Sequence, residues 1–506
     1  MKSLKPQLKI SMFLLALLSM TACGYNSDRS SKGGGYYYSG YSYEKPSSYT
    51  PAISRSADNN QSRSSQRSDS NYENPFINVT RDNTNNVSLT SSTFAYPTIR
   101  EEINNNHLYN VKEMVKTEEM LNYFSYGYVN DTDDALAAKL ELDKCPWDNT
   151  HYLASIVVKA KPAVTQNVKN NIVILIDKSG SMSPVMSLVK ISLRTLVENM
   201  ADDDIVSIVS YASGCKVECE GKTGLEKNYL NTVIDGFKAS GATNGEAGLE
   251  TAYDVAYKYF IPEGNNRVVI LTDGDFNVGK TSGEELTKLI KKNASDGVYL
   301  TCCGYRSYDN DTLYTLANNG NGNAYYIDGE LEAKKVFQEE LGKSLFVAAK
   351  DAKCQVSFSD KVKSYRLLGY ETRQITDQEF ENTRKDAGEI MSDHTTVALY
   401  ELIMNNNNVH QDDYYFKATL HYKDPVTEEN KEVKATKTDI SVSRRADYDF
   451  ASYVAEFALI LSESKYKGSS SYNHLLSIID NNAITDVYRD EFVSLVTKAK
   501  NLAQRQ

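Results

Sequence analysis

The chain has 506 residues, which is enough for two or three domains with a sizeable buried core. Its formal net charge is −11 at pH 7, and 41% of its residues are hydrophobic, so most of it is expected to fold. No basic stripe interrupts this acidic balance, and we therefore expect no nucleic-acid partner.

The first segment has the order of a targeting signal. Three lysines lie among the first nine residues, and an apolar stretch covers residues 10–20. Small Thr21 and Ala22 then directly precede Cys23. This order resembles the lipobox of bacterial lipoproteins, which implies removal of residues 1–22 and acylation of Cys23. A transmembrane anchor is disfavoured because the apolar stretch is too short to span a bilayer. An ordinary cleaved signal with a chance cysteine is the remaining alternative. We expect a protein of the cell envelope, lipid-anchored to a bacterial membrane and facing outside the cytoplasm.

A segment of biased composition follows the signal. Residues 23–90 are rich in Gly, Ser, Tyr and Asn, with few aliphatic side chains and no sustained hydrophobic period. Such a composition cannot bury enough apolar surface to form a core. It predicts a disordered stalk that separates the folded part from the membrane.

Predicted strands and helices alternate from residue 170 onward. The strands are runs of apolar residues without polar alternation, and the intervening segments have helical hydrophobic spacing. We predict strands over 172–176, 205–211, 267–272 and 298–302, and helices over 185–200, 246–260, 284–292, 311–318 and 331–345. This pattern indicates an α/β fold, namely a doubly wound, mostly parallel sheet covered on both faces.

Oxygen-bearing side chains gather where these strands end. Asp177, Ser179 and Ser181 follow the first strand, Thr243 precedes a helix, and Asp273 follows the strand over 267–272. Ligands of such sheets bind beyond the carboxyl ends of the strands. Hydroxyls and carboxylates, without histidine or thiol, are ligands for a hard cation, Mg²⁺ first and Mn²⁺ or Ca²⁺ as alternatives.

In this arrangement the segment resembles a von Willebrand factor type A (vWA) domain, and the three loops resemble its metal-ion-dependent adhesion site. The resemblance implies that Ser179 and Ser181 bind the ion through their hydroxyls. It implies that Thr243 binds directly or through water, and that Asp177 and Asp273 act mainly through water. In this family, a carboxylate from a protein partner commonly completes the coordination sphere.

Strand-like sequence lies on both sides of this domain, for example "YLASIVVKAK" before it and "YYFKATLHY" after it. We therefore predict a β-rich flanking domain into which the vWA domain is inserted, followed by helices over 448–464 and 485–503. The flanks look like segments of bacterial surface lipoproteins that carry one such domain. The expected divisions are signal 1–22, stalk 23–90, N-terminal vWA-associated segment 91–165, vWA domain 166–346 and C-terminal domain 347–506.

The residues favour binding over catalysis. Six histidines are scattered, none in a recognisable triad or zinc motif, and we predict that the protein is not an enzyme. A lone histidine in a turn, such as His394, is more often a scaffold residue than a catalytic one. The leading hypothesis is that the protein binds an acidic side chain of a protein partner through the metal ion. The alternative is a scaffold for envelope assembly in which the metal is purely structural.

Overall fold

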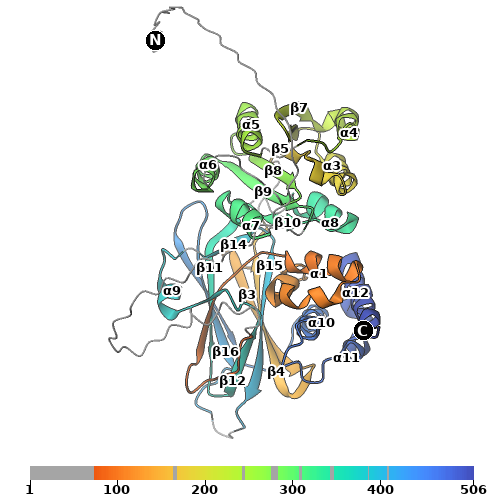
Figure 1. Cartoon of the computed structure of the whole chain (residues 1–506). Helices are drawn as coiled ribbons and strands as arrows, with labels where there is room; N and C mark the ends of the chain where they lie inside the picture. Colours follow the sequence, from red (N-terminus) through yellow and green to blue (C-terminus); the bar gives the residue numbers. More distant parts are fainter. Residues whose placement is uncertain are drawn as a thin grey trace, which may run out of the picture. The chain divides into compact units, whose positions relative to one another are not determined.

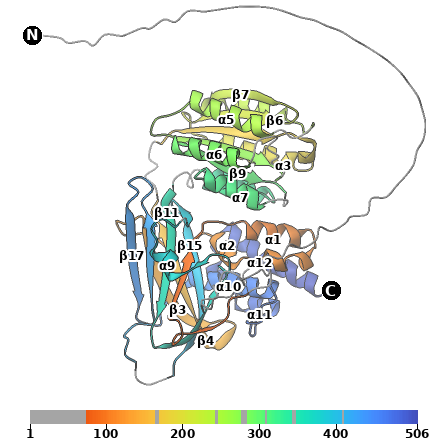
Figure 2. The ribbon, with the colours of Figure 1, turned by 60° about the vertical axis from the view of Figure 1, so that its left-hand side comes forward.

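The computed structural model describes residues 73–162, 168–241, 245–274, 283–306, 310–341, 347–385, 387–406 and 410–505. These residues form an α/β domain, two flanking β-sheets and a layer of helices (Figures 1 and 2). The predicted signal, most of the predicted stalk, Cys23 and Thr243 lie outside the described residues.

The α/β domain is built on one six-stranded sheet. Its strands are β5 (Asn170–Asp177), β6 (Ile205–Tyr211), β7 (Cys215–Thr223), β8 (Asn265–Thr272), β9 (Val298–Gly304) and β10 (Ala324–Tyr326). The order is β10-β9-β8-β5-β6-β7, and every pair is parallel except β6 with β7. The predicted doubly wound, mostly parallel sheet is confirmed, with an antiparallel edge strand, β7, that was not predicted.

Helices cover both faces of this sheet because neighbouring strand residues point to opposite sides. Ile172, Ile174 and Ile176 pack in the core that holds α3, α4 and α8, whereas Val173 and Leu175 pack in the core of α5, α6 and α7. The helices are α3 (Met186–Asn199), α4 (Lys227–Asp235), α5 (Gly245–Lys258), α6 (Gly283–Ser295), α7 (Asn310–Asn319) and α8 (Glu330–Lys334). The short segments are η4 (Gly180–Met182), η5 (Gly224–Glu226) and η6 (Lys335–Glu340), the last a π-helical turn. The helix predicted over 331–345 is therefore divided between α8 and η6.

Two β-sheets form the flanking unit and share one apolar core. The first has the order β1-β12-β15-β4-β3, and the second has the order β13-β2-β11-β16-β17, with β14 paired to β11. Their strands are β1 (Ile77–Asn78), β2 (Thr84–Ser88), β3 (Leu136–Cys145), β4 (Asp148–Ala160), β11 (Val347–Phe358), β12 (Val362–Leu368), β13 (Gln374–Ile375), β14 (Gly388–Met391), β15 (Thr395–Met404), β16 (Phe416–Lys423) and β17 (Asn430–Lys437). Helix α9 (Asp377–Glu381) lies between β13 and β14 in the chain.

The α/β domain is inserted into this unit, as predicted. Strand β4 precedes the inserted domain and pairs with β15, which follows it, so that Lys159 lies opposite Thr395. The chain enters the domain after β4, in the first sheet, and resumes with β11, in the second.

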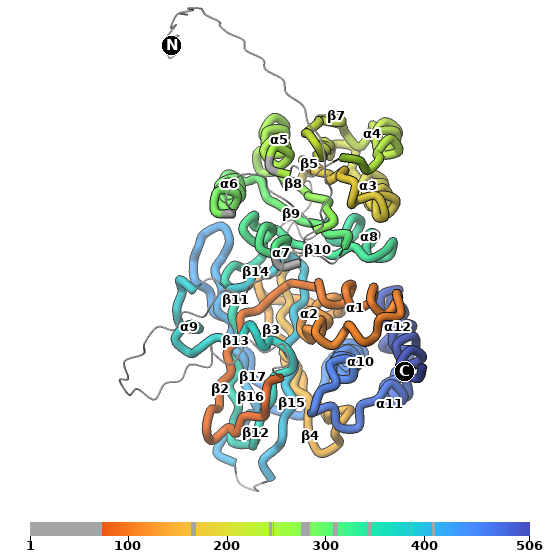
Figure 3. Tube along the Cα trace, viewed as in Figure 1, coloured from red at the N-terminus to blue at the C-terminus, as the bar shows by residue number. Residues whose placement is uncertain are grey.

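Strands β1 and β2 correct the predicted extent of the stalk. Residues 73–90 fall within the segment assigned to it, yet the chain here is part of the flanking unit (Figure 3). Strand β2 pairs with β11, and its central residues are buried. Asn85 accepts a hydrogen bond from the Tyr400 hydroxyl at 2.8 Å, and the Asn86 amide donates to Asp377 at 2.6 Å. Polar side chains that find buried partners can fold into a core, which composition alone does not reveal.

Helices from both ends of the described chain form the third layer. They are α1 (Ala95–Asn104), α2 (Thr117–Asn122), α10 (Arg445–Leu461), α11 (Tyr472–Ile478) and α12 (Val487–Ala503), with short turns η2 (Leu108–Asn110), η3 (Lys112–Met114) and η7 (Asn481–Ala483). Aromatic side chains fill their common core, and Phe124, Phe450 and Phe492 meet edge to face. The helices predicted over 448–464 and 485–503 correspond to α10 and α12. None of the helices in the described ranges is long and apolar enough to cross a membrane.

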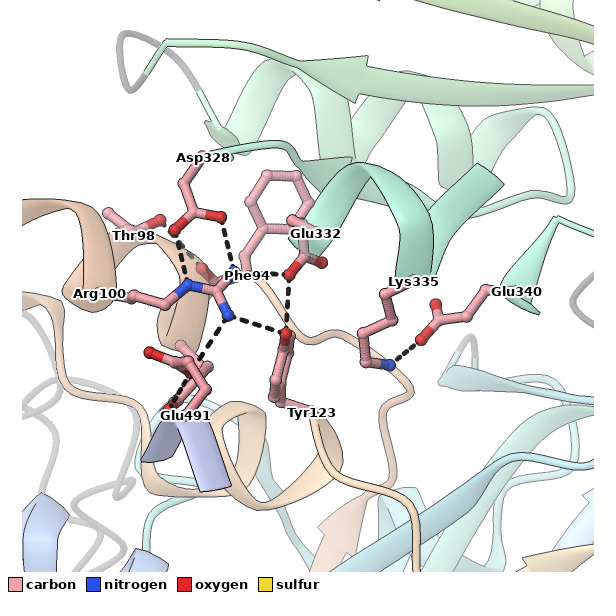
Figure 4. Close-up of polar contacts among 10 residues, drawn as sticks. Phe94, Thr98, Arg100, Tyr123, Asp328, Glu332, Lys335, Glu340 and Glu491 are labelled. Atoms are coloured by element: carbon pink, nitrogen blue, oxygen red, sulfur yellow. Dashed lines mark hydrogen bonds and ion pairs between the residues drawn. The ribbon is translucent and has the colours of Figure 1, made fainter. Parts of the chain in front are cut away.

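A buried ionic cluster joins the helical layer to the α/β domain (Figure 4). Arg100 of α1 donates to Asp328, which follows β10, and to Glu332 of α8 at 2.7 Å. The Tyr123 hydroxyl donates to the same Glu332 oxygen at 2.8 Å, and Arg100 approaches Glu491 of α12 at 3.4 Å. The cluster therefore fixes the last strand and helix of the α/β domain against α1 and α12.

Candidate metal centre

The centre lies at the carboxyl end of β5, the strand between β6 and β8. The β5 side chains are buried from Asn171 onward, and Asp177 at its end has no exposed surface. The parallel pairing continues one residue further, because the Lys178 amide donates to the Tyr211 carbonyl at 2.8 Å. The chain then turns through η4 into α3. Because β5 is paired on both sides, it holds the Asp177 carboxylate in a fixed position at the carboxyl end of the sheet.

Both carboxylate oxygens of Asp177 accept hydrogen bonds from the protein. The Ser179 amide donates to Oδ1 at 2.7 Å, and the Tyr211 hydroxyl donates to Oδ2 at 3.1 Å. Burial raises the pKa of Asp177, these hydrogen bonds lower it, and the nearby charge of Asp273 raises it again. Burial also raises the pKa of Tyr211 well above its ordinary value, so its hydroxyl keeps the proton that it donates.

The two serine hydroxyls lie side by side. The Oγ atoms of Ser179 and Ser181 are 2.9 Å apart, and Ser179 is buried whereas Ser181 is exposed. The Gly180 amide between them donates to the Gly241 carbonyl at 3.1 Å. This contact ties the first predicted loop to the chain just before the second, although Thr243 in that loop lies outside the described residues.

Asp273 completes the described part of the centre. It follows β8, is 2% exposed, and its Oδ1 atom is buried without a hydrogen-bond partner among the described residues. Gly274 next to it has φ 98°, a conformation that glycine adopts readily. A buried carboxylate oxygen without a hydrogen-bond donor costs free energy of folding. A cation, or a water molecule bound to a cation, would satisfy this oxygen.

The donor set fits a small hard cation. Adjacent ligands of an octahedral Mg²⁺ at about 2.1 Å lie about 3.0 Å apart, close to the 2.9 Å between the Ser179 and Ser181 oxygens. Among the described residues, no group of three or more His, Cys, Asp or Glu could hold a metal ion. A metal site at this edge therefore depends on hydroxyls, with Asp177 and Asp273 supplying negative charge.

The structure thus brings together four of the five predicted ligands, Asp177, Ser179, Ser181 and Asp273. It also adds Tyr211, which sequence reasoning missed. The signal that could have found it is its place at the end of the strand over 205–211, because parallel neighbours end at the same sheet edge. Beside the centre, partial burial raises the pKa of Glu218, but the ion pair with Lys178 at 2.6 Å and contacts with Lys216 and Ser210 lower it to about 2. All six cysteines in the described residues are free.

The fold and this loop arrangement define a protein with a vWA domain. A family model described as von Willebrand factor type A domain matches residues 171–339, and one described as von Willebrand factor matches residues 62–155. A third, described as uncharacterized protein YfbK, C-terminal, matches residues 343–502. The chain is 31% identical to the uncharacterized protein YfbK of Escherichia coli (strain K12) over 459 residues, which cover 84% of this chain and 80% of that one. The chain therefore belongs to the YfbK family.

More distant similarities have lower sequence identity and cover less of this chain. The chain is 26% identical to the voltage-dependent calcium channel subunit alpha-2/delta-2 of Mus musculus over 240 residues, 44% of this chain and 20% of that protein. Among solved structures, a von Willebrand factor type A protein from Catenulispora acidiphila aligns with a TM-score of 0.37, 14% identity, and coverage of 73% of this chain and 91% of that one. The ArnB paralog VWA2 from Sulfolobus acidocaldarius aligns with a TM-score of 0.32, 17% identity, and coverage of 73% and 98%.

Proposed function

We propose that this protein is a cell-envelope lipoprotein whose vWA domain binds a divalent cation at a metal-ion-dependent adhesion site and, through it, an acidic side chain of a protein partner. The observation that carries the proposal is the buried Oδ1 atom of Asp273, which has no hydrogen-bond partner in the part of the chain that the structure describes. It lies near Asp177 and the paired serine hydroxyls. The vWA domain itself supports the proposal, because vWA domains commonly carry such a site and mediate protein interactions.

The residues divide into two groups by their oxygen chemistry. Ser179, Ser181 and Thr243 would offer neutral hydroxyl ligands to Mg²⁺, with Mn²⁺ or Ca²⁺ as alternatives. Asp177 would act mainly through water, because both of its oxygens already accept hydrogen bonds from the protein. Asp273 would also act mainly through water, and its Oδ1 atom would accept a hydrogen bond from a water bound to the cation. The bound cation would supply a net positive charge at the sheet edge, which two carboxylates held at a distance neutralise only in part.

An acidic partner follows from this charge balance. A partner's Asp or Glu forms a charge-assisted contact with a bound cation that a hydroxyl or amide cannot equal. The proposed role is therefore recognition, and the protein is proposed to act as an interaction module and not as an enzyme. A lipid on Cys23 would hold the module at a bacterial membrane, outside the cytoplasm.

Calorimetric titration of Mg²⁺ into the purified full chain tests the metal site. We expect binding heat from the wild type and from Asp202→Ala, an exposed aspartate of the same domain, and none from Asp177→Ala. Equal heats from wild type and Asp177→Ala would mean that these loops hold no ion, and the proposal would fall. Partner capture from envelope extract with Mg²⁺ or with chelator then tests the role, and capture that ignores the chelator would contradict metal-dependent recognition.

One observation favours the alternative function, a scaffold for envelope assembly with a purely structural metal. Asp177 is fully buried and already accepts two internal hydrogen bonds, as expected of a group that holds loops together. In that case Mg²⁺ would stabilise the protein, yet replacing the acidic residues of a captured partner by amides would leave its binding unchanged.

A further inference from the structure

We infer that Tyr211 is a positioning residue of the metal centre, which holds the Asp177 carboxylate and thereby sets both the affinity for Mg²⁺ and the preference for Mg²⁺ over Ca²⁺. This inference rests on the proposed function. It assigns a role to a residue that lies on the neighbouring strand and contributes no ligand of its own.

Tyr211 contacts the first metal loop from two directions. Its carbonyl accepts the Lys178 amide at 2.8 Å, and its hydroxyl donates to Asp177 Oδ2 at 3.1 Å. The backbone contact fixes where the loop leaves the sheet, and the side-chain contact fixes the rotation of the carboxylate. The Ser179 amide holds the other oxygen at 2.7 Å, so the plane of the carboxylate is defined at both ends.

The same side chain also lies beside strand β8 and helix α5. Thr272, the residue before Asp273, forms a further hydrogen bond with the Tyr211 hydroxyl. On the third side, Gly248 of α5 packs against the tyrosine. A Cβ atom at Gly248 would lie 3.0 Å from Tyr211 Cβ and 3.1 Å from Cδ1, closer than packed side chains normally allow. Tyr211 therefore contacts β5, β8 and α5.

The place of Tyr211 in the core makes it a rigid support. Its side chain is 1% exposed and packs in the core that covers the α5 face of the sheet. Partners that orient a metal-binding carboxylate typically change metal affinity by about 10- to 100-fold when they are removed. Mg²⁺ demands near-ideal octahedral geometry, whereas Ca²⁺ accepts flexible coordination. Loosening Asp177 should therefore weaken Mg²⁺ binding more than Ca²⁺ binding.

The test compares two tyrosines of the same domain that each lose one oxygen atom. In Tyr211→Phe the hydrogen bond to Asp177 disappears. The control is Tyr253→Phe on α5, because the Tyr253 hydroxyl is buried without a hydrogen-bond partner among the described residues. Mg²⁺ and Ca²⁺ are titrated separately into each full-length protein, and the melting temperature of each is measured in chelator.

We expect Tyr211→Phe to bind Mg²⁺ about 10- to 100-fold more weakly and to lose less affinity for Ca²⁺. It should stay folded in chelator but melt below Tyr253→Phe, because Asp177 Oδ2 loses its hydrogen-bond donor. Tyr253→Phe should bind both ions like the wild type. If Tyr211→Phe does not fold, Gly248→Ala displaces the ring while keeping its hydroxyl, and the same loss is expected from it. An unchanged Mg²⁺ dissociation constant, or an equal loss for the two ions, overturns the inference while the metal site stands. A wild type that binds neither ion overturns the proposed function itself.

Discussion

The guanidinium of Arg100 grips the carboxylate of Asp328 with two hydrogen bonds, Nε to Oδ2 and Nη2 to Oδ1, both 2.6 Å long. The two side chains are 4% and 5% exposed. Arg100 belongs to the helical layer and Asp328 to the vWA domain, so this buried pair joins two parts of the chain that are far apart in sequence. A planar guanidinium with two parallel bonds also fixes orientation, which a lysine could not do.

Removing this guanidinium should be strongly destabilising. In Arg100→Ala, the carboxylates of Asp328 and Glu332 stay buried without their cation, which costs about 3–5 kcal/mol of unfolding free energy. The control is Arg194→Ala on α3, whose partner Asp235 is exposed, and which should cost about 1 kcal/mol or less. Urea unfolding of the two variants measures the difference, and similar losses would show that the buried cluster does not hold the layers together.

A second prediction concerns stability at mildly acidic pH. Burial lowers the pKa of His394 from its ordinary value of 6.5 to about 4. Four charged groups also act on the ring, with opposing effects: Glu340, Lys335, Lys159 and Asp393. Between pH 6.5 and 4 the unfolded chain binds a proton at this ring that the folded chain does not. The unfolding free energy should therefore fall as the pH is lowered through this window, by about 1–2 kcal/mol at pH 5.

The variant His394→Asn should lack this contribution. Its unfolding free energy should change less than that of the wild type between pH 7 and pH 5, as measured by urea unfolding at each pH. The same substitution at exposed His107 is the control and should keep the wild-type pH dependence. Parallel curves for His394→Asn and wild type would show that this ring is not protonated differently in the two states.

The pattern of the vWA sheet could be predicted because each of its central strands is a short apolar run buried on both faces. The edge strand β7 could not, because most of its side chains are polar and only Cys219 among them is buried. Nor could β2, whose asparagines are satisfied by Tyr400 and Asp377, residues some three hundred positions away. Such pairings depend on tertiary contacts that a local pattern does not contain.

The metal loops, too, could be predicted from the sequence only in part. Asp177, Ser179, Ser181 and Asp273 could be placed together because they follow strands whose carboxyl ends meet at one edge. The roles of individual oxygens could not be predicted, because they depend on contacts across strands. The hydrogen bond from Tyr211 to Asp177 joins β6 to β5, and no spacing in the sequence encodes it.

A third prediction is that Mg²⁺ stabilises the fold through the serine hydroxyls. At a Mg²⁺ concentration of a hundred times its dissociation constant, the unfolding free energy of the wild type should rise by about 2.7 kcal/mol. Ser181→Ala should lose most of this gain at the same concentration, since one oxygen ligand is gone. Ser183 is exposed and lies two residues further along the chain, so Ser183→Ala should keep the Mg²⁺-induced gain in unfolding free energy. Equal Mg²⁺-induced shifts in the two variants, measured by urea unfolding, would argue against Ser181 as a ligand.

A fourth prediction concerns the anchor. If Cys23 is acylated, Cys23→Ser should leave the membrane fraction or accumulate as an unprocessed precursor that keeps residues 1–22. Cell fractionation followed by mass measurement of the protein distinguishes these forms. Cys215→Ser, which removes an exposed free thiol, should fractionate like the wild type. Membrane partitioning of Cys23→Ser at the wild-type mass would contradict the lipoprotein proposal.

The insertion of the vWA domain between β4 and β11 determines the order in which the chain can fold during synthesis. Strands β3 and β4 leave the ribosome early. Strand β15, which pairs with β4, begins only at Thr395. Strands β5 to β10 form a contiguous stretch, so the vWA sheet can close while β4 still has an open edge. We expect the inserted domain to fold first, and the apolar faces of β3 and β4 to need protection from aggregation until the C-terminal strands arrive.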